Sequence, residues 1–186
     1  MRVLVTGPAR SGKSEWAEAI ALGRQRAGQQ VVYVATALTT PDDPEWQARI
    51  AQHQQRRPPE WACLEVPVAL AAAIQRARPD ECLLVDSLGT WLANLLEQDE
   101  AAWGQTLGEL RQALHDASGD VILVAEEVGW GVVPSYPIGR QFRDRLGQVT
   151  RSVGAIADET YLVTAGHVLN LSQLGMPLDK VLNEAG

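Results

Sequence analysis

The sequence predicts an α/β fold built on a mainly parallel sheet, and three observations support this prediction. Apolar, β-branched runs such as Val31–Ala35 and Val121–Ala125 alternate with helical stretches of about 10–20 residues. Several runs are followed directly by glycine, serine or a carboxylate, which is typical of the ligand-binding edge of an open parallel sheet. The last two apolar runs, 161–163 and 168–171, flank an Ala-Gly turn and predict a hairpin, so one antiparallel strand is expected at the C-terminal edge.

The elements of the first half of the chain are bounded by glycine and proline. Gly28 closes the first helix, Pro58-Pro59 stops the second, and Pro79 follows the third, because these residues do not continue a helix. Pro67 stands at the start of the third helix, where proline is favoured. The expected strands are residues 1–6, 31–35 and 61–66, and the expected helices are residues 13–28, 45–57 and 67–78.

The second half continues this alternation. Residues 82–85 and 121–125 are apolar throughout, as expected for central strands that are buried on both faces. No internal repeat or low-complexity linker interrupts the chain, so residues 1–186 are expected to form a single domain. The helices expected in this half are residues 88–97, 101–117 and 138–157.

The composition excludes several classes of protein. Hydrophobic residues make up 46% and charged residues 21% of the chain, which is typical of a globular protein. The net charge of −7 argues against a nucleic-acid-binding surface, because such surfaces neutralise phosphates. No apolar run has the length of a membrane span and no signal peptide precedes the first strand, so a cytoplasmic protein is expected. Cys63 and Cys82 lie in apolar, strand-like surroundings and are expected to be buried free thiols.

The first strand leads into the motif Gly7-Pro8-Ala9-Arg10-Ser11-Gly12-Lys13-Ser14. It matches G-x-x-x-x-G-K-[ST] between an apolar run and a helical stretch, the context that a phosphate-binding P-loop requires. Backbone N–H groups of such a loop and the N-terminus of the following helix bind phosphate oxygens. Lys13 is expected to reach the β- and γ-phosphates, and the Ser14 hydroxyl to bind Mg²⁺. The chain is therefore predicted to bind a nucleoside triphosphate in a P-loop NTPase fold of the RecA-like kind.

Carboxylates follow two further strands of the predicted sheet. Asp86 comes after the run 82–85, the position of a carboxylate that holds Mg²⁺ or its water in P-loop proteins. Its alternative role is to cap the next helix. Glu126 and Glu127 follow the run 121–125, where they either orient a substrate hydroxyl, bind a metal or form an acidic turn.

The predicted helix 45–57 places three side chains on one face. Arg49, His53 and Arg57 are spaced at i, i+4 and i+8. The two arginines make an anion-binding face and favour the neutral imidazole, which is the nucleophilic form. His53 could then attack phosphorus and carry the transferred group covalently. A solvated polar face with an incidental histidine has the same spacing.

The other histidines and the later arginines indicate no separate site. His115 near a helix end and His167 in the hairpin have no ligand-like neighbours and are expected to be structural. Arg140, Arg143 and Arg145, on the last long helix, face either phosphates or solvent, and solvent is expected for at least two of them.

Four motifs occur together in this chain. They are Leu4–Ser14; Arg49–His53 with Arg57-Pro58, Trp61 and Glu65; Leu83–Ser87 with Asn94–Leu96; and Glu127–Pro134. The P-loop alone is generic, but its combination with R-I-x-x-H-x-x-x-R-P and E-V-G-x-G-x-V-P is specific. Over residues 2–165 the chain resembles the bifunctional adenosylcobinamide kinase/adenosylcobinamide-phosphate guanylyltransferase family of cobalamin biosynthesis.

The resemblance implies two reactions on a corrinoid substrate. ATP or GTP phosphorylates adenosylcobinamide, and GMP from GTP then passes through a guanylyl-histidine to adenosylcobinamide phosphate, giving adenosylcobinamide-GDP. His53 stands at the position of the guanylylated histidine, and a homo-oligomer is expected. Because a proline-containing loop precedes helix 45–57, this helix is expected to move and bring His53 to the P-loop. The nucleotide-binding positions implied are Gly7, Pro8, Ala9, Arg10, Ser11, Gly12, Lys13, Ser14, Thr36, Arg56, Arg57, Glu65 and Asp86, with Lys13 also catalytic and Mg²⁺ held by Ser14 and Asp86.

The chain departs from the family pattern at two positions. Gly7-Pro8 stands where relatives commonly have Gly-Gly, and proline has no N–H to give to a phosphate. Some relatives carry Glu at the position of Asp86, which changes reach but keeps the charge. Two alternatives stay open: a monofunctional P-loop kinase for another small molecule, in which His53 has no role, and a non-catalytic GTP-binding module.

Overall fold

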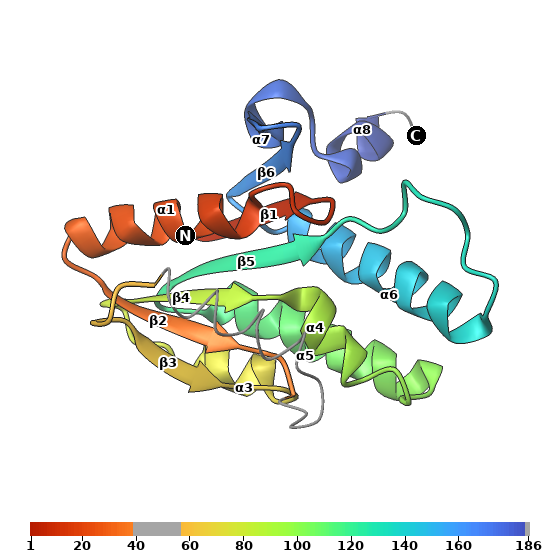
Figure 1. The fold of residues 1–186 in the computed structure, drawn as a ribbon, viewed down its shortest axis with the longest axis horizontal. Helices are drawn as coiled ribbons and strands as arrows, with labels where there is room; N and C mark the ends of the chain where they lie inside the picture. The colour runs from red at the N-terminus through yellow and green to blue at the C-terminus, as the bar shows by residue number, and fades with distance from the viewer. Residues whose placement is uncertain (39–56, 185–186) are drawn as a thin grey trace.

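The structure, a computed structural model, describes residues 1–38 and 57–184, with a seven-stranded sheet at its centre (Figure 1). The strand order is β3-β2-β4-β5-β1-β6-β7. Neighbouring strands are parallel except β6 and β7, which are antiparallel, so the predicted fold class and C-terminal edge are confirmed. The strands are β1 (Arg2–Gly7), β2 (Gln30–Ala35), β3 (Ala62–Glu65), β4 (Glu81–Asp86), β5 (Asp120–Glu126), β6 (Glu159–Thr164) and β7 (His167–Asn170).

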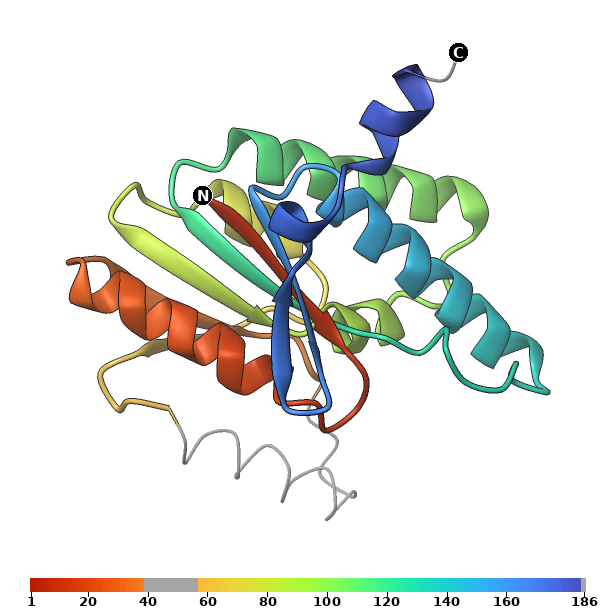
Figure 2. The ribbon, with the colours of Figure 1, turned by 90° about the horizontal axis from the view of Figure 1, so that it is seen from above.

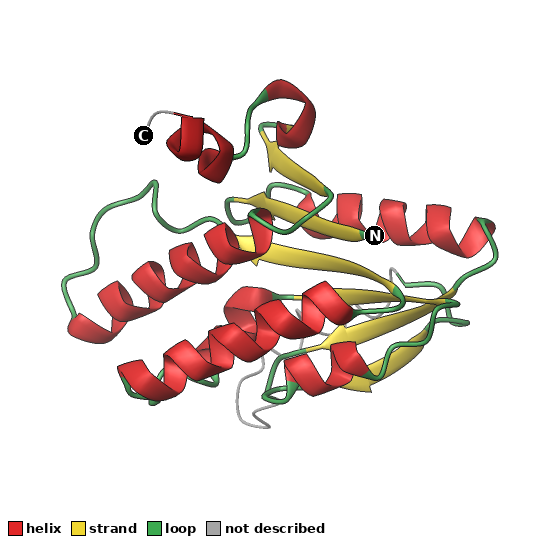
Figure 3. Cartoon of the chain, turned by 180° about the vertical axis from the view of Figure 1, so that it is seen from behind, coloured by secondary structure: helices red, strands yellow, loops and turns green. Residues whose placement is uncertain are grey.

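Helices cover both faces of the sheet (Figure 2). The helices of the described part are α1 (Lys13–Arg26), α3 (Leu70–Gln75), α4 (Leu88–Ala93), α5 (Glu100–Asp116), α6 (Pro137–Gly154), α7 (Leu171–Leu174) and α8 (Leu178–Glu184). Helix α1 lies on one face, and α3, α4, α5 and α6 lie on the other, where Figure 3 shows them from behind. Two hydrophobic cores result, one on each side of the sheet.

Alternation along the strands assigns each side chain to one of these cores. On β4, Cys82 and Leu84 join the core under α1, whereas Leu83 and Val85 join the core under the other helices. The central strands are buried on both faces, which explains why their sequences are apolar throughout rather than alternating. The same alternation decides on which face a polar residue at a strand end emerges.

The parallel strands end at one edge of the sheet, and their register brings the predicted site residues to that edge. Gly7 pairs with Glu126, and Ala35 lies between Glu65 on one neighbouring strand and Asp86 on the other. The sequence expectation that residues just after the strands share one edge is confirmed. This is the edge at which open α/β sheets bind ligands.

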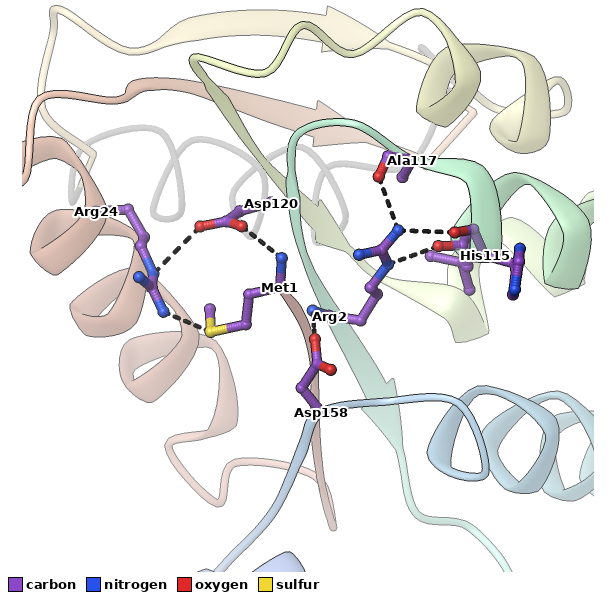
Figure 4. Close-up of polar contacts among 8 residues, drawn as sticks. Met1, Arg2, Arg24, His115, Ala117, Asp120 and Asp158 are labelled. Carbon is purple, nitrogen blue, oxygen red and sulfur yellow. Dashed lines mark hydrogen bonds and ion pairs between the residues drawn. The ribbon is translucent and has the colours of Figure 1, made fainter.

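The opposite edge is held by the first two residues of the chain (Figure 4). The Met1 ammonium group contacts Asp120 Oδ1 at 2.6 Å, and Arg24 Nε lies 3.5 Å from Oδ2 of the same carboxylate. The Arg2 guanidinium donates to the carbonyls of Leu114, His115 and Ala117 at 2.6, 2.9 and 2.7 Å. Because the last carbonyls of a helix have no intrahelical donor, Arg2 completes the C-terminal end of α5.

Two helices are shorter than expected, for one physical reason. Helix α3 was expected to begin at residue 67, but the Pro67 and Val68 carbonyls accept hydrogen bonds from the side chains of Asn94 and Trp91 at 2.9 Å each. Those carbonyls are therefore used in packing against α4 instead of in a helical ladder. Helix α4 ends at Ala93 rather than at residue 97, because Asn94 also donates to the Thr36 carbonyl and terminates the helix there.

One cysteine was assigned wrongly. Cys82 is buried in the centre of the sheet as expected, but Cys63 is exposed. Cys63 lies on β3, which is an edge strand, and every residue of that strand is exposed. A short apolar run does not distinguish an edge strand from a central one. The predicted helix 45–57 begins within the undescribed part of the chain and is not tested.

Candidate nucleotide-binding site

Both motif glycines of the P-loop are required by the backbone. The loop joins β1, which ends at Gly7, to α1, which begins at Lys13. Gly12 has a φ of 91°, in the left-handed region that other residues rarely adopt. At Gly7 a Cβ atom would clash with the carbonyl oxygen of Val163 on β6. The loop therefore curls tightly over the sheet edge and leaves the N-terminus of α1 open to an anion.

Two hydrogen-bond donors are held inside this loop. The side chain of Lys13 is nearly buried, and its Nζ donates to the Pro8 carbonyl at 3.3 Å. The Ser11 hydroxyl is buried and has no hydrogen-bond partner in the described part of the chain. Buried polar groups normally find partners, so a ligand with several acceptor oxygens fits this loop.

The two residues assigned to Mg²⁺ lie within reach of each other. Ser14 Oγ, at the start of α1, donates to Oδ1 of Asp86, the last residue of β4, at 3.4 Å. A hydroxyl and a carboxylate are ligands that Mg²⁺ accepts together with phosphate oxygens and water. Within residues 1–38 and 57–184, no group of three or more His, Cys, Asp and Glu side chains could hold a metal.

Tyr33 is a buried neighbour of Asp86 that the sequence patterns did not single out. Its hydroxyl donates to Asp86 Oδ2 at 3.0 Å, and the guanidinium carbon of Arg57 lies 3.2 Å from the centroid of its ring. Burial, followed by the nearby Asp86 carboxylate, raises the pKa of Tyr33, so the phenol stays protonated and remains a donor. Strand alternation is the signal that points to it, because Tyr33 and Asp86 emerge on the same face of adjacent strands.

Thr36 is placed just behind the site rather than on its surface. Its side chain is fully buried, and its hydroxyl bonds to the Ser87 carbonyl at 2.7 Å and to the Thr90 hydroxyl at 2.5 Å. The Ser87 amide donates back to the same hydroxyl at 3.0 Å. This network ties the end of β2 to the start of α4 and occupies the Thr36 side chain within the protein.

Glu65 and Arg57 lie toward the β3 side of the site. Glu65 is the exposed last residue of β3, in register with Ala35, so it lies at this edge of the sheet. Arg57 is partly buried against Tyr33. His53, Arg49 and Arg56 belong to the part of the chain outside the described residues, so their predicted roles are not tested.

The acidic pair after β5 divides into two different roles. Glu126 accepts hydrogen bonds from the Ser87 hydroxyl at 2.5 Å and the Gly89 amide at 3.0 Å. It therefore fastens the N-terminus of α4 to the sheet. Glu127 accepts from the Gly129 amide at 2.5 Å, while its own amide donates to the Gly7 carbonyl at 2.9 Å. Of the three roles left open, a turn fits Glu127, whereas Glu126 has a further structural role at the start of α4.

The arginines of α6 make contacts within the protein, and Arg145 differs from the expectation that each faces phosphate or solvent. Its guanidinium is buried, donates to the Gln98 carbonyl at 2.8 Å and contacts Glu100 at 3.0 Å. It faces neither phosphate nor solvent, because it holds the turn between α4 and α5. Arg140 donates to the Pro134 and Ser135 carbonyls, and Arg143 contacts its neighbour Asp144. His115 and His167 were expected to be structural; both are exposed, and their ring nitrogens contact the Asp116 carboxylate and the Ala165 carbonyl.

Two solved structures are similar to this chain at low sequence identity. The flagellar accessory protein FlaH from Methanocaldococcus jannaschii has a TM-score of 0.49 and 14% identity, covering 91% of this chain and 75% of its own. A KaiC-like protein from Pyrococcus horikoshii has a TM-score of 0.46 and 18% identity, covering 87% and 69%.

Three curated relatives are similar over most of their length. The bifunctional adenosylcobalamin biosynthesis protein CobP of Pseudomonas aeruginosa is 40% identical over 183 residues, which is 96% of this chain and 100% of that protein. The proteins named CobU of Salmonella typhimurium and Escherichia coli are 37% and 38% identical over 181 residues, covering 89% of this chain and 97% of each relative. Residues 3–171 match the profile of one family, a span that includes the P-loop, Asp86 and the Glu127 loop. The chain belongs to the cobinamide kinase/cobinamide phosphate guanyltransferase family.

Proposed function

We propose that this chain phosphorylates adenosylcobinamide with ATP or GTP and then transfers GMP from GTP to the product, forming adenosylcobinamide-GDP. The observation that carries this proposal is the family match over residues 3–171 together with a P-loop whose Ser14 lies against Asp86. The similarity to relatives named for adenosylcobalamin biosynthesis supports the corrinoid as the substrate class.

In the kinase step, the P-loop holds the triphosphate so that the substrate hydroxyl can attack the γ-phosphorus. The new O–P bond forms as the bond from the γ-phosphorus to the bridging oxygen breaks, the nucleoside diphosphate leaves and the hydroxyl gives up its proton. Lys13 releases the Pro8 carbonyl and places its ammonium group on the β- and γ-phosphate oxygens, where charge develops. Ser14 and Asp86 are the residues that would hold Mg²⁺. A bound Mg²⁺ would neutralise phosphate charge. Positioning is most of the catalysis in such a reaction.

In the transferase step, the neutral imidazole of His53 attacks the α-phosphorus of GTP. The new N–P bond forms as the P–O bond to the β-phosphate breaks, and pyrophosphate leaves. A phosphate oxygen of adenosylcobinamide phosphate then attacks the same phosphorus and releases His53. Arg56 and Arg57 would hold phosphate, and Thr36 would lie beside the nucleotide. The Glu65 carboxylate would accept hydrogen bonds from the N1–H and N2–H groups of guanine.

Radiolabelled GTP distinguishes the two chemistries. Label from the α-phosphate should become protein-bound and acid-labile, whereas label from the γ-phosphate should not. The α-label should disappear in His53→Ala, while phosphorylation of adenosylcobinamide continues at about the parent rate. A Lys13→Ala variant should lose the phosphorylation. Persistence of the α-label in His53→Ala would overturn the role of His53.

The same assay separates the other possibilities. A monofunctional kinase would transfer only γ-phosphate and form no guanylyl-enzyme, and a binding module would bind GTP without turnover in the presence of the corrinoid. No helix within the described residues is both long and apolar enough to cross a membrane. We propose a single-domain cytoplasmic enzyme that works as a homo-oligomer, uses Mg²⁺ and binds no nucleic acid.

A further inference from the structure

Tyr33 occupies a position where the sheet alone requires only an apolar side chain. It lies on β2 under α1, is only 3% exposed, and packs with Val31 and Leu84 in the core of that face. Its register partner on β4 is Leu84, and Asp86 lies two residues further along that strand. A phenylalanine would fill the same apolar position, so the hydroxyl group needs a separate explanation.

The Tyr33 hydroxyl contacts the Asp86 carboxylate, which faces the P-loop. It donates to Asp86 Oδ2 at 3.0 Å, while Oδ1 of the same carboxylate accepts from Ser14 Oγ at 3.4 Å. The two oxygens of Asp86 are thereby distinguished, because one is held from within the protein and the other is turned toward the P-loop serine. A hydrogen bond to a charged acceptor is stronger than one between neutral groups, so it restrains rotation of the carboxylate.

The ring of the same tyrosine contacts a residue from another segment. The Arg57 guanidinium carbon lies 3.2 Å from the ring centroid, within the range of a cation–π contact. Arg57 Nε is buried and finds no acceptor among the residues that the structure describes. The aromatic face therefore contacts and supports the Arg57 guanidinium.

We propose that Tyr33 is a positioning residue of the nucleotide site. Its hydroxyl orients Asp86 so that Oδ1 faces Ser14, and its ring holds the Arg57 guanidinium beside the same site. One buried side chain therefore sets the geometry of the carboxylate that would hold Mg²⁺ and of a cation that would hold phosphate. This proposal rests on the assignment of Ser14, Asp86 and Arg57 to Mg²⁺ and phosphate in the proposed function.

The role of the hydroxyl is tested with Tyr33→Phe, which keeps the ring. Equilibrium binding of a fluorescent GTP analogue is titrated with Mg²⁺ and repeated with EDTA. The Mg²⁺ concentration that gives half of the change in binding of the GTP analogue should rise about tenfold. Removing a residue that orients a metal-binding group typically lowers metal affinity by about 10–100-fold. Affinity in EDTA should stay unchanged, which a merely structural defect would not produce.

Tyr161→Phe is the matched control for this variant. Tyr161 on β6 also donates its hydroxyl to a carboxylate, Glu159, at 2.8 Å, but it lies away from the nucleotide edge. Its Mg²⁺ titration should match that of the parent. An unchanged Mg²⁺ titration in Tyr33→Phe would overturn the role of Tyr33 alone. A parent protein that binds GTP without any Mg²⁺ dependence would overturn the assignment of Ser14 and Asp86 as well.

The role of the ring is tested by a double-mutant cycle with Arg57→Ala, read as GTP affinity in EDTA. In the parent and in Tyr33→Phe, Arg57→Ala should weaken binding by about three- to tenfold, because the ring still holds the arginine. In Tyr33→Leu, where the ring is gone, Arg57→Ala should have almost no further effect. An equal loss in all three backgrounds would overturn the coupling of Arg57 to Tyr33.

Discussion

Lys13 Nζ donates a hydrogen bond of 3.3 Å to the carbonyl oxygen of Pro8, five residues earlier in the same loop. Pro8 cannot offer an N–H to a phosphate, but its carbonyl accepts this hydrogen bond from the lysine. In the proposed function, the Lys13 ammonium group exchanges this carbonyl for phosphate oxygens. Because the bond is long, its loss costs little compared with a charge-assisted bond to a phosphate oxygen.

Replacing Pro8 by glycine should raise GTP affinity and lower the stability of the protein. Pro8→Gly adds one backbone N–H to the phosphate-binding loop, so GTP affinity should rise by about ten- to hundredfold, the value of one hydrogen bond to a charged group. The same change frees the unfolded chain and should lower the free energy of unfolding by about 0.4–1 kcal/mol. Isothermal titration and urea unfolding measure the two effects.

The control for this variant is Pro8→Ala, which also restores the N–H but allows less backbone freedom. It should give a similar gain in affinity with a smaller loss of stability. Weaker binding in both variants would show that the rigid proline, rather than an N–H at this position, serves the triphosphate.

Asp86 should tolerate a longer carboxylate but not the loss of its charge. Asp86→Asn removes the charge facing Ser14 and should lower kcat of the phosphorylation by about 10²–10³-fold, the size of one electrostatic contact to a transition state. Asp86→Glu keeps the charge and should retain activity within about tenfold of the parent. Steady-state kinetics over a range of Mg²⁺ concentrations distinguish the two.

The matched control is Asp116→Asn on α5. Asp116 is exposed, and hydrogen bonds from His115 and Gln112 lower the pKa of its carboxyl group far from the nucleotide edge. Asp116→Asn should leave kcat of the phosphorylation unchanged. If Asp86→Asn behaved like this control, the carboxylate at the end of β4 would have no part in the reaction.

The positions of the strands along the chain and the P-loop could be predicted from the sequence because both are local. An apolar run followed by Gly7 and Lys13 needs no tertiary information, and the same is true of the run that ends at Asp86. Contacts between distant segments could not be predicted. The hydrogen bonds that shorten α3 come from Asn94 and Trp91, and the exposure of Cys63 follows from the place of β3 at the edge.

The site was predicted in part for the same reason. Asp86 ends one parallel strand, and the P-loop after another carries Ser14, so both were expected at the same edge of the sheet. Tyr33 was missed because it lies inside a strand, where an aromatic residue normally indicates packing. Glu126 was left open because a carboxylate after a strand looks the same whether it meets a ligand or, as here, the start of α4.

Arg2 should contribute to stability without contributing to catalysis. Arg2→Met removes three hydrogen bonds to the last carbonyls of α5 (Figure 4) and should lower the free energy of unfolding by about 2 kcal/mol. The melting temperature should fall by about 4–8 °C. Arg111→Met, on the exposed face of the same helix, should change stability by less than about 0.5 kcal/mol. Equal melting temperatures for the two variants would contradict the capping role.

The two thiols should differ in reactivity. Iodoacetamide at pH 8 should label the exposed Cys63 in the native protein and leave Cys82 unlabelled until the protein is unfolded, as mass spectrometry can measure. Burial, with the nearby Asp120 carboxylate as the second cause, raises the pKa of Cys82 from 9.0 to about 12. Between these two pKa values, the Cys82 thiol therefore keeps its proton in the native protein but has lost it in the unfolded chain.

Alkaline stability should reveal this difference in proton binding. Between pH 9 and about pH 12 the unfolded state binds fewer protons than the native state at Cys82, so the free energy of unfolding should fall as pH rises. One such group contributes a slope of about 1.4 kcal/mol per pH unit. Tyr33, whose pKa is also raised by burial, adds to the fall at higher pH. Urea unfolding of the parent and Cys82→Val at pH 8, 9.5 and 10.5 isolates the thiol, because only the parent should carry its share of the slope. Parallel pH profiles for the two proteins would contradict the raised pKa of Cys82.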